Sequence, residues 1–130
     1  MVETVDVKTT AREEMVDITD RVREVVRRSG VQEGVVHLWS MHTTCGLTVN
    51  EGFDPDVVRD VVVALRRVFP RDGDYRHAEG NSDSHLKTAF VGPGLTLLVD
   101  GGDLVLGRWQ RVLLCEWDGP RPRTVKVRVG

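Results

Sequence analysis

The residues best suited to chemistry lie in three polar segments of the chain. These are residues 42–51, residues 77–85, and residues 109–123, and they contain most of the His, Asn, Gln and Glu side chains that hydrophobic periodicity does not explain. We expect each segment in a loop or at a strand end. Such positions hold functional groups on a rigid scaffold. The order and types of these residues suggest a polar site for a small molecule.

The histidines are the strongest candidates for metal binding. Of the four histidines, His37 falls in the middle of an expected strand and is interpreted as structural. His42, His77 and His85 fall in the polar segments. Three imidazole nitrogens with an open position are typical of catalytic zinc, so we predict a divalent metal there. The alternative is that each is a surface or turn histidine, since their spacing matches no standard zinc motif.

Acid–base candidates stand ahead of an expected helix. Glu51 is a candidate general base or a partner that orients a histidine, with Asn50 beside it. The alternative is that the carboxylate stabilises the positive end of the helix dipole. Cys45 is a candidate ligand or nucleophile, but a cysteine next to glycine is more often a small packed residue.

Cationic and amide side chains provide candidates for substrate binding. Lys87 and Arg121 could bind a phosphate or carboxylate, and Thr43 and Gln110 are assigned to the same role. For Arg123 we favour a solvated charge without a functional role. Arg121 has the alternative of pairing with a carboxylate within the turn at 118–122.

Composition excludes several classes of function. The formal net charge is -2, from 18 basic and 20 acidic residues. Because the two signs are interspersed, the chain lacks the clustered Lys and Arg that nucleic-acid binding needs. No signal peptide is visible, and no apolar run approaches the ~20 residues that span a bilayer. We expect one soluble, cytoplasmic domain over residues 1–130, with Cys45 and Cys115 as reduced thiols.

Two helices and several strands must position these residues. The first strands are expected at 2–8 and 14–18, followed by a helix capped by Thr19 and ended at Gly30. Strand 34–41 and an extended piece from Leu47 follow. Asp54-Pro55 starts the clearest amphipathic helix, which ends before Pro70.

The second half is mainly strand. After a long polar loop at 70–84, a short helix is expected to run to Phe90. Strands follow at 95–99, 104–106, 108–117 and 124–129, with a tight hairpin turn at Gly101-Gly102. Helices do not alternate with strands throughout. The pattern therefore predicts an α+β fold: a two-sheet β-sandwich with two main helices on one side.

The motifs together resemble those of the YjbQ-like family, also described as secondary thiamine-phosphate synthase enzymes. The matching pieces are H-T-T-C-G-L-T-V-N-E at 42–51, D-P-D-V at 54–57, H-A-E-G-N-S-D-S-H-L-K at 77–87, G-R-W-Q-R-V at 107–112, and E-W-D-G-P-R-P-R at 116–123. The family often has Ser and Ala where this chain has Thr44 and Cys45, and Ala where it has Ser84. An essential role for the Cys45 thiol is therefore not expected.

The resemblance implies a homotrimer with a polar pocket near the subunit contact. It points to His42, His77 and His85 as pocket residues, with a second group of polar residues close by: Asn50, Glu51, Asn81 and Arg121. It also implies a weak activity that joins a pyrimidine diphosphate to a thiazole phosphate, giving thiamine phosphate.

Three hypotheses for function follow. The first is an enzyme for a small phosphorylated substrate, either a thiamine-phosphate synthase or a metal-dependent hydrolase, with a metal bound by the three histidines. Its catalytic groups would be Glu51, Asn50, Asn81 and Arg121, and Arg121 and Lys87 would neutralise the phosphate. The metal would be zinc, or Mg²⁺ for a diphosphate substrate. The second is a non-enzymatic metal- or ligand-binding homotrimer. The third is a structural protein whose histidines satisfy hydrogen bonds.

Overall fold

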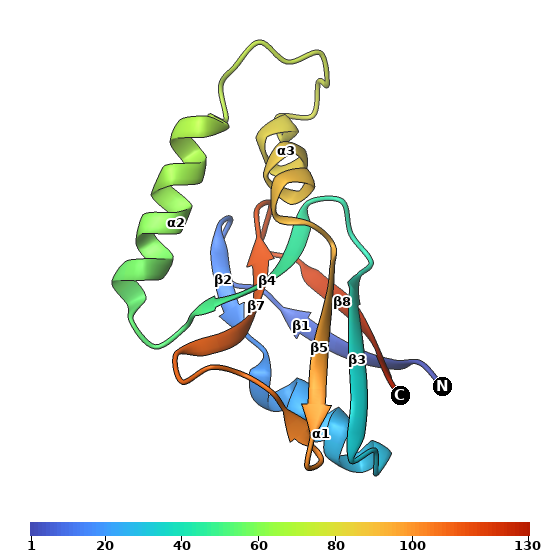
Figure 1. Cartoon of the computed structure of the whole chain (residues 1–130). Helices are drawn as coiled ribbons and strands as arrows, with labels where there is room; N and C mark the ends of the chain where they lie inside the picture. Colours follow the sequence, from blue (N-terminus) through green and yellow to red (C-terminus); the bar gives the residue numbers. More distant parts are fainter.

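The chain folds into eight strands and three helices, and the predicted α+β class is confirmed. A computed structural model describes residues 1–130. The elements are β1 (Glu3–Lys8), β2 (Glu14–Asp17), α1 (Thr19–Ser29), β3 (Glu33–Ser40), β4 (Cys45–Glu51), α2 (Pro55–Val68), α3 (Ser82–Val91), β5 (Gly94–Asp100), β6 (Asp103–Leu104), β7 (Gln110–Glu116) and β8 (Pro122–Val129). Figure 1 shows their arrangement.

Two antiparallel sheets pack face to face. One has the strand order β1-β8-β3-β5-β6 and the other the order β2-β7-β4. Alternate apolar residues of both sheets point into one core, which includes Val36, Leu38, Leu47, Leu114 and Val125. Valine dominates this core because a β-branched side chain suits a pleated, half-buried surface. The sandwich therefore forms a rigid frame from which the loops project.

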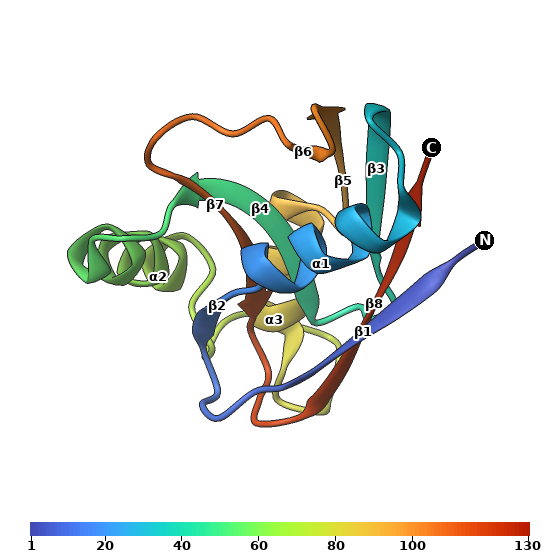
Figure 2. The same cartoon turned by 90° about the horizontal axis from the view of Figure 1, so that it is seen from below.

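The three helices do not share one side of the sandwich, contrary to the sequence-based prediction. Seen from below, α1 lies between the strands of the two sheets, whereas α3 lies at the opposite end of the molecule (Figures 1 and 2). Val22, Val25 and Val26 of α1 belong to the same core as both sheets. Each helix covers a different part of the sandwich, because two packed sheets leave their ends and their outer faces exposed.

The start of α1 also differs from the prediction. Thr19 is the first residue of the helix rather than its cap, and it is buried. Its hydroxyl donates to Asp17 and accepts from the backbone N–H of Val112, 2.7 Å away. The hydroxyl thus links α1 to β7. At the other end, Gly30 adopts φ 73°, which confirms the predicted left-handed stop.

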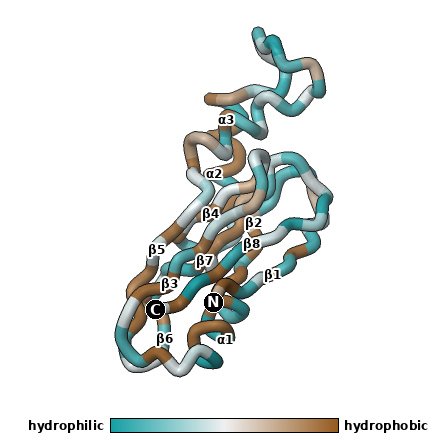
Figure 3. The backbone as a smooth tube through the Cα atoms, turned by 90° about the vertical axis from the view of Figure 1, so that its right-hand side faces the viewer, coloured by the Kyte–Doolittle hydropathy of each residue, from teal (hydrophilic) through white to brown (hydrophobic).

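Helix α2 covers the outer face of the three-stranded sheet. Asp54 accepts a hydrogen bond from the N–H of Asp56, as the predicted cap requires. Val62 and Leu65 pack against Cys115 and Trp117, which form a second, smaller core. The loop between α2 and α3 extends beyond the sheets and is mostly hydrophilic (Figure 3).

Helix α3 lies at one end of the sandwich, beside the start of β4 and the turn after β7. The hydroxyl of Ser84 donates to the backbone carbonyl of Trp117, and the N–H of Leu47 bonds to the carbonyl of Gly92 at the end of α3. These bonds fix α3 against β4 and the turn after β7. At the far end, Gly101 and Gly102 have φ 59° and 76° in the predicted tight turn.

No helix of the structure has the length and apolar character needed to cross a membrane.

Candidate functional site

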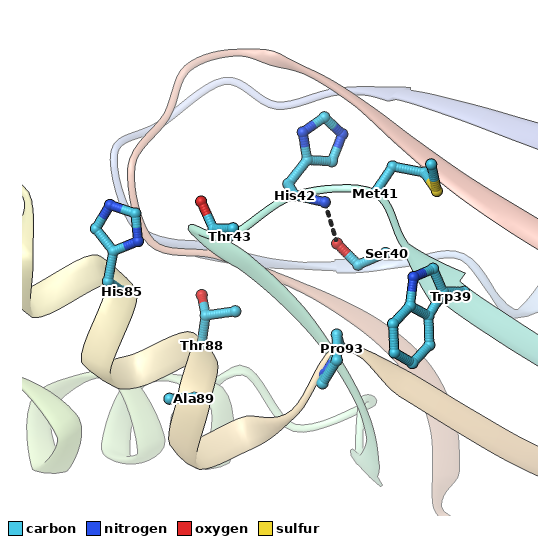
Figure 4. A pocket seen from close by; sticks show the side chains of 9 residues that line it. All are labelled: Trp39, Ser40, Met41, His42, Thr43, His85, Thr88, Ala89 and Pro93. Carbon is cyan, nitrogen blue, oxygen red and sulfur yellow. Dashed lines mark hydrogen bonds between the residues drawn. The ribbon is translucent and has the colours of Figure 1, made fainter.

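A cavity of about 490 Å³ opens where β3 ends and α3 begins. Its walls come from the β3–β4 connection, α3 and the start of β5 (Figure 4). The lining residues are Trp39, Ser40, Met41, His42, Thr43, His85, Thr88, Ala89 and Pro93. The volume falls within the range of roughly 300–1,000 Å³ that is usual for small-molecule sites. Three of the predicted site residues, His42, Thr43 and His85, therefore share one cavity.

His42 is held as a neutral hydrogen-bond donor. Its Nε2 accepts from the backbone N–H of Thr124 at 2.8 Å. Burial lowers the pKa of His42, and the positive charges of Arg123 and Arg121 lower it further. In a neutral ring with Nε2 as acceptor, Nδ1 must carry the hydrogen. His42 can thus donate a hydrogen bond from Nδ1.

His77 and His85 form an edge-to-face pair. Their ring centroids lie 5.2 Å apart with an interplanar angle of 85°. His85 comes from the first turns of α3, whereas His77 comes from the loop before it. This contact places the third predicted histidine next to the cavity, although His77 does not line it. The pair offers two imidazoles for proton transfer at one edge of the cavity.

A chain of polar contacts connects His77 to the turn after β7. His77 Nε2 lies 2.9 Å from Asn81 Oδ1, and Asn81 Nδ2 donates to Asp118 Oδ2 at 2.8 Å. Arg121 pairs with the same carboxylate oxygen at 3.1 Å. Asn81 and Arg121 thus lie in one chain of contacts with His77, the histidine that the family resemblance implied as their neighbour. Asp118, which joins them, was not predicted as a site residue.

Beneath the turn lies a buried ion pair. Arg123 and Glu116 are 3% and 0% exposed, and their charged groups are in direct contact. Burial alone would raise the pKa of Glu116, but hydrogen bonds from Arg123 and Thr9 outweigh it and lower that pKa. Arg123 also donates to Thr44, so the pair holds the β3–β4 connection in place. The prediction that Arg123 is a solvated charge is wrong, because its partners lie inside the fold.

Lys87 is engaged elsewhere and does not reach the cavity. Its ammonium group is 1% exposed and bonds to Asp83 at 2.8 Å and to Glu13 at 2.9 Å. Burial by itself would raise the pKa of Asp83. The hydrogen bonds and positive charges of Arg12 and Lys87 lower it by more, so the pKa of Asp83 lies below its usual value. Lys87 therefore holds α3 to the segment before β2, and its assignment to phosphate binding does not fit this geometry.

The remaining predicted residues lie at the other end of β4. Asn50 and Glu51 end the strand that Cys45 begins, about 20 Å away at roughly 3.3 Å per residue. Glu51 accepts from the backbone N–H groups of Phe53 and Asp54. Gln110 lies opposite Glu51 in the register. Within one chain these three residues do not join the histidines, and Glu51 follows the alternative reading as a local helix-start residue.

The cysteines are buried thiols. Cys45 is 0% exposed, and burial raises its pKa to about 12. Burial raises the pKa of Cys115 as well. A thiol rather than a thiolate is then present at neutral pH, and the thiol is a poor nucleophile and metal ligand. The packed reading of Cys45 fits this environment.

Sequence reasoning missed Asp118, Glu116 and Thr88 as parts of the site. Thr88 is buried, and its hydroxyl has no hydrogen-bond partner in the fold. Figure 4 shows that hydroxyl directed toward Thr43 and His85. The E-W-D-G motif was a usable signal for the two acids. The sequence held no signal for Thr88, because the hydroxyl of a threonine within a helix usually faces solvent or bonds to its own helix backbone.

A metal on all three histidines does not fit the arrangement in this chain. A metal ligand needs a free lone pair, and the one on His42 Nε2 already accepts the N–H of Thr124. No group of three or more His, Cys, Asp or Glu residues is arranged to hold a metal ion. Only His77 and His85 remain as an adjacent pair of imidazoles.

The fold and site define a small α+β domain with a histidine-lined cavity. Comparison with known protein families shows to which family this domain belongs. The family model of UPF0047 proteins, described as YjbQ-like, matches residues 3–130. The chain therefore belongs to the UPF0047 family of YjbQ-like proteins, which confirms the resemblance seen in the motifs.

Individual relatives agree over nearly the full length. UPF0047 protein YugU of Bacillus subtilis is 40% identical, covering 99% of this chain and 98% of YugU. UPF0047 protein MJ1081 of Methanocaldococcus jannaschii is 39% identical, covering 95% and 89%. The crystal structure of a YjbQ/UPF0047 family protein from Clostridium acetobutylicum has a TM-score of 0.97 at 42% identity, covering 98% and 99%. The conserved hypothetical protein TT1486 of Thermus thermophilus gives 0.92 at 45% identity, covering 98% and 99%.

Proposed function

We propose that this protein is a small-molecule enzyme that acts on a phosphorylated substrate in the cavity beside His42 and His85. The observation that carries the proposal is the convergence of imidazoles from distant segments on one cavity. His42 and His85 line it, and His77 contacts His85. Titratable groups gathered at a well-formed pocket mark a candidate active site.

Each polar group has a role that its contacts allow. His42 donates a hydrogen bond from Nδ1, because Nε2 is occupied by Thr124. His77 and His85 transfer protons through their ring nitrogens, since the two imidazoles lie together at the edge of the cavity. Arg121 binds the phosphate: its bonds to Asp118 use Nε and Nη2, which leaves Nη1 for a phosphate oxygen. Asn81 orients His77.

The reaction to test first is the one that the family resemblance implies. Joining a pyrimidine diphosphate to a thiazole phosphate releases diphosphate, and a cation at the leaving group favours that departure. We include a weak thiamine-phosphate synthase activity in the proposal. Within one chain the chemistry uses the histidine end alone, because Glu51, Asn50 and Gln110 lie about 20 Å away along β4.

The deciding experiment compares two histidine variants in a thiamine-phosphate synthesis assay. His85→Ala removes a cavity imidazole, and we expect turnover to fall by about 10²- to 10⁴-fold. His37→Ala is the matched control, because His37 lies on the exposed face of β3 and bonds only to Thr96. Equal turnover in wild type and His85→Ala would remove these imidazoles from that reaction.

A divalent metal remains part of the proposal in a narrower form. Zinc, when bound, would be held by His77 and His85 in place of proton transfer by these two rings, and Mg²⁺ would accompany a diphosphate substrate rather than bind the imidazoles. Elemental analysis of protein purified without a metal-affinity tag tests this. We expect zinc in the wild type and its loss in His77→Ala. Metal-free wild-type protein would exclude a tightly bound metal.

A non-enzymatic homotrimer that binds a ligand is the alternative, and an exposed apolar surface favours assembly. Trp39 and Met41 are 55% and 53% exposed at the cavity, and Leu98 is 61% exposed on the neighbouring strand β5. Val35 lies directly opposite Leu98, so these residues share the outer face of the five-stranded sheet. Exposed apolar patches of this kind mark protein contacts. Sedimentation equilibrium of wild type and Leu98→Glu tests it: we expect a trimer that the charge dissociates.

A further inference from the structure

The proposed function leaves open which nitrogen of His77 is available for proton transfer. A neutral imidazole has one N–H and one lone pair, and its hydrogen-bond partners decide which nitrogen carries which. His77 Nε2 faces Asn81 Oδ1 at 2.9 Å. An amide oxygen only accepts, so the direction of this contact depends on how the amide of Asn81 is turned.

Asp118 determines that orientation. An ionised carboxylate accepts hydrogen bonds and donates none. The group of Asn81 that faces Asp118 Oδ2 at 2.8 Å must therefore be its NH₂. The amide oxygen is then left for His77, and Nε2 must be the nitrogen that donates.

The carboxylate itself is held from two sides. Arg121 pairs with Asp118 Oδ2 at 3.1 Å and donates from Nε to its backbone carbonyl at 2.7 Å. The backbone N–H of Asp118 donates to buried Glu116 at 3.0 Å. The side chain of Asp118 is only 15% exposed. Gly119 lets this turn lie close to the segment that contains Ala11, because a β-carbon at Gly119 would lie 2.3 Å from the carbonyl oxygen of Ala11.

We propose that Asp118 is a positioning residue that sets the tautomer of His77. Through Asn81 it fixes the hydrogen on Nε2 and leaves the lone pair on Nδ1. Nδ1 is then the nitrogen that accepts a proton or a substrate hydrogen bond. The usefulness of this arrangement rests on the proposed function, but the tautomer itself is a property of the free protein.

The variant Asp118→Asn replaces a group that only accepts hydrogen bonds by one that can also donate, without changing the shape of the side chain. The new amide can present its own NH₂ to Asn81, which permits the amide of Asn81 to turn over. Its NH₂ would then face His77, so Nε2 would become the acceptor and the hydrogen would move to Nδ1. In wild type the carboxylate forbids this arrangement.

The measurement is long-range ¹H–¹⁵N NMR of the histidine rings, at about pH 8 where an unperturbed imidazole is neutral. The spectrum of His77→Gln assigns the His77 signals by their loss. We expect predominantly Nε2–H in wild type and a several-fold rise in the Nδ1–H fraction in Asp118→Asn. Asp60→Asn is the matched control, since Asp60 lies on α2 and bonds only to exposed Arg59; it should leave the ring signals unchanged.

A second variant covers the case in which Asp118→Asn does not fold. Asn81→Ala removes the acceptor of Nε2–H, and an Nδ1–H signal should then appear. Unchanged His77 ring signals in a folded variant of either kind would overturn the proposal. The synthesis assay separates the two hypotheses: a moved tautomer with unchanged turnover supports the role of Asp118 and counts against His77 in catalysis.

Discussion

The two ends of strand β4 carry similar residue types but are built differently. At the end that begins with Cys45, Asn81, Asp118 and Arg121 come from distant segments and meet through side-chain contacts, and His42 accepts from the backbone N–H of Thr124. At the end that closes with Glu51, the side-chain bonds of the predicted site residues are local. Glu51 accepts from Phe53 and Asp54, and Gln110 accepts from Gly107.

This difference separates residues that build a site from residues that shape a turn. Long-range contacts between polar side chains cost conformational entropy, and a buried ion pair supports them at the histidine end. The bonds of Glu51 and Gln110 need no such support, because they span only a few residues. Its exposed features are Phe53 and Trp109, which form an edge-to-face pair with ring centroids 6.0 Å apart. Similar sequence motifs thus have unequal structural roles.

The largest expected effect is on the ion pair that supports the histidine end. Arg123→Met leaves Glu116 as a buried, unpaired charge, and we expect the free energy of unfolding to fall by about 3–5 kcal/mol. Urea denaturation measures this. Glu51→Gln at the other end should change it by less than about 1 kcal/mol. Equal losses in the two variants would break the comparison.

The same pair predicts a dependence of stability on pH. Because the pKa of Glu116 is lowered in the fold, its contribution is present above the unfolded value of about 4.3 and is lost as pH falls through the lower, folded pKa. The urea midpoint should therefore fall steeply below about pH 4. Glu116→Gln should flatten this slope. A slope that is the same in both proteins would assign the acid sensitivity to other carboxylates, such as Asp83 and Glu13.

Two buried threonines at the histidine end should respond in opposite directions. Thr88→Val removes a hydroxyl that has no partner, and we expect unfolding free energy to rise by about 1 kcal/mol. Thr9→Val removes hydrogen bonds to Glu116 and Arg121 and should lower it by about 1–3 kcal/mol. Thermal unfolding of both variants gives the test. A loss in Thr88→Val would mean that its hydroxyl is satisfied in solution.

A comparably small effect is expected at the aromatic pair of the Glu51 end. Trp109→Ala should cost about 0.5–1.5 kcal/mol, the range for an aromatic pair, since the side chain is 54% exposed. Turnover should stay at the wild-type level. A large loss of turnover with little loss of stability would show that this end serves the cavity as well, which requires a second copy of the chain.

Much of the fold could be read from the pattern of the chain. The α2 helix has its Asp54 cap, its apolar stripe and its end before Pro70 in the sequence, and all three are local signals. The Gly101-Gly102 turn was likewise readable, because positive φ favours glycine. The start of α1 was not, since Thr19 lies inside the helix and its hydroxyl accepts a bond from Val112 of the distant strand β7.

The site could be predicted only in part. The histidines and Arg121 stood out by type, but type alone could not separate a solvated Arg123 from a buried one. Nor could residue type show that the ammonium group of Lys87 forms ion pairs with Asp83 and Glu13. Each of these two side chains has at least one partner more than 70 positions away: Glu13 for Lys87 and Thr44 for Arg123. Spacing along the chain carries no information about such partners.

The sequence by itself determined the elements, the family and the residues capable of chemistry, because helix caps, turns and alternating apolar positions act between near neighbours. The tertiary structure alone decided which of those residues meet. It brought His42 and His85 to one cavity with His77 against His85, and it left Glu51 at the far end of β4. The physical reason is that burial and pairing of a charge depend on the packing of whole sheets and helices, which no local pattern specifies.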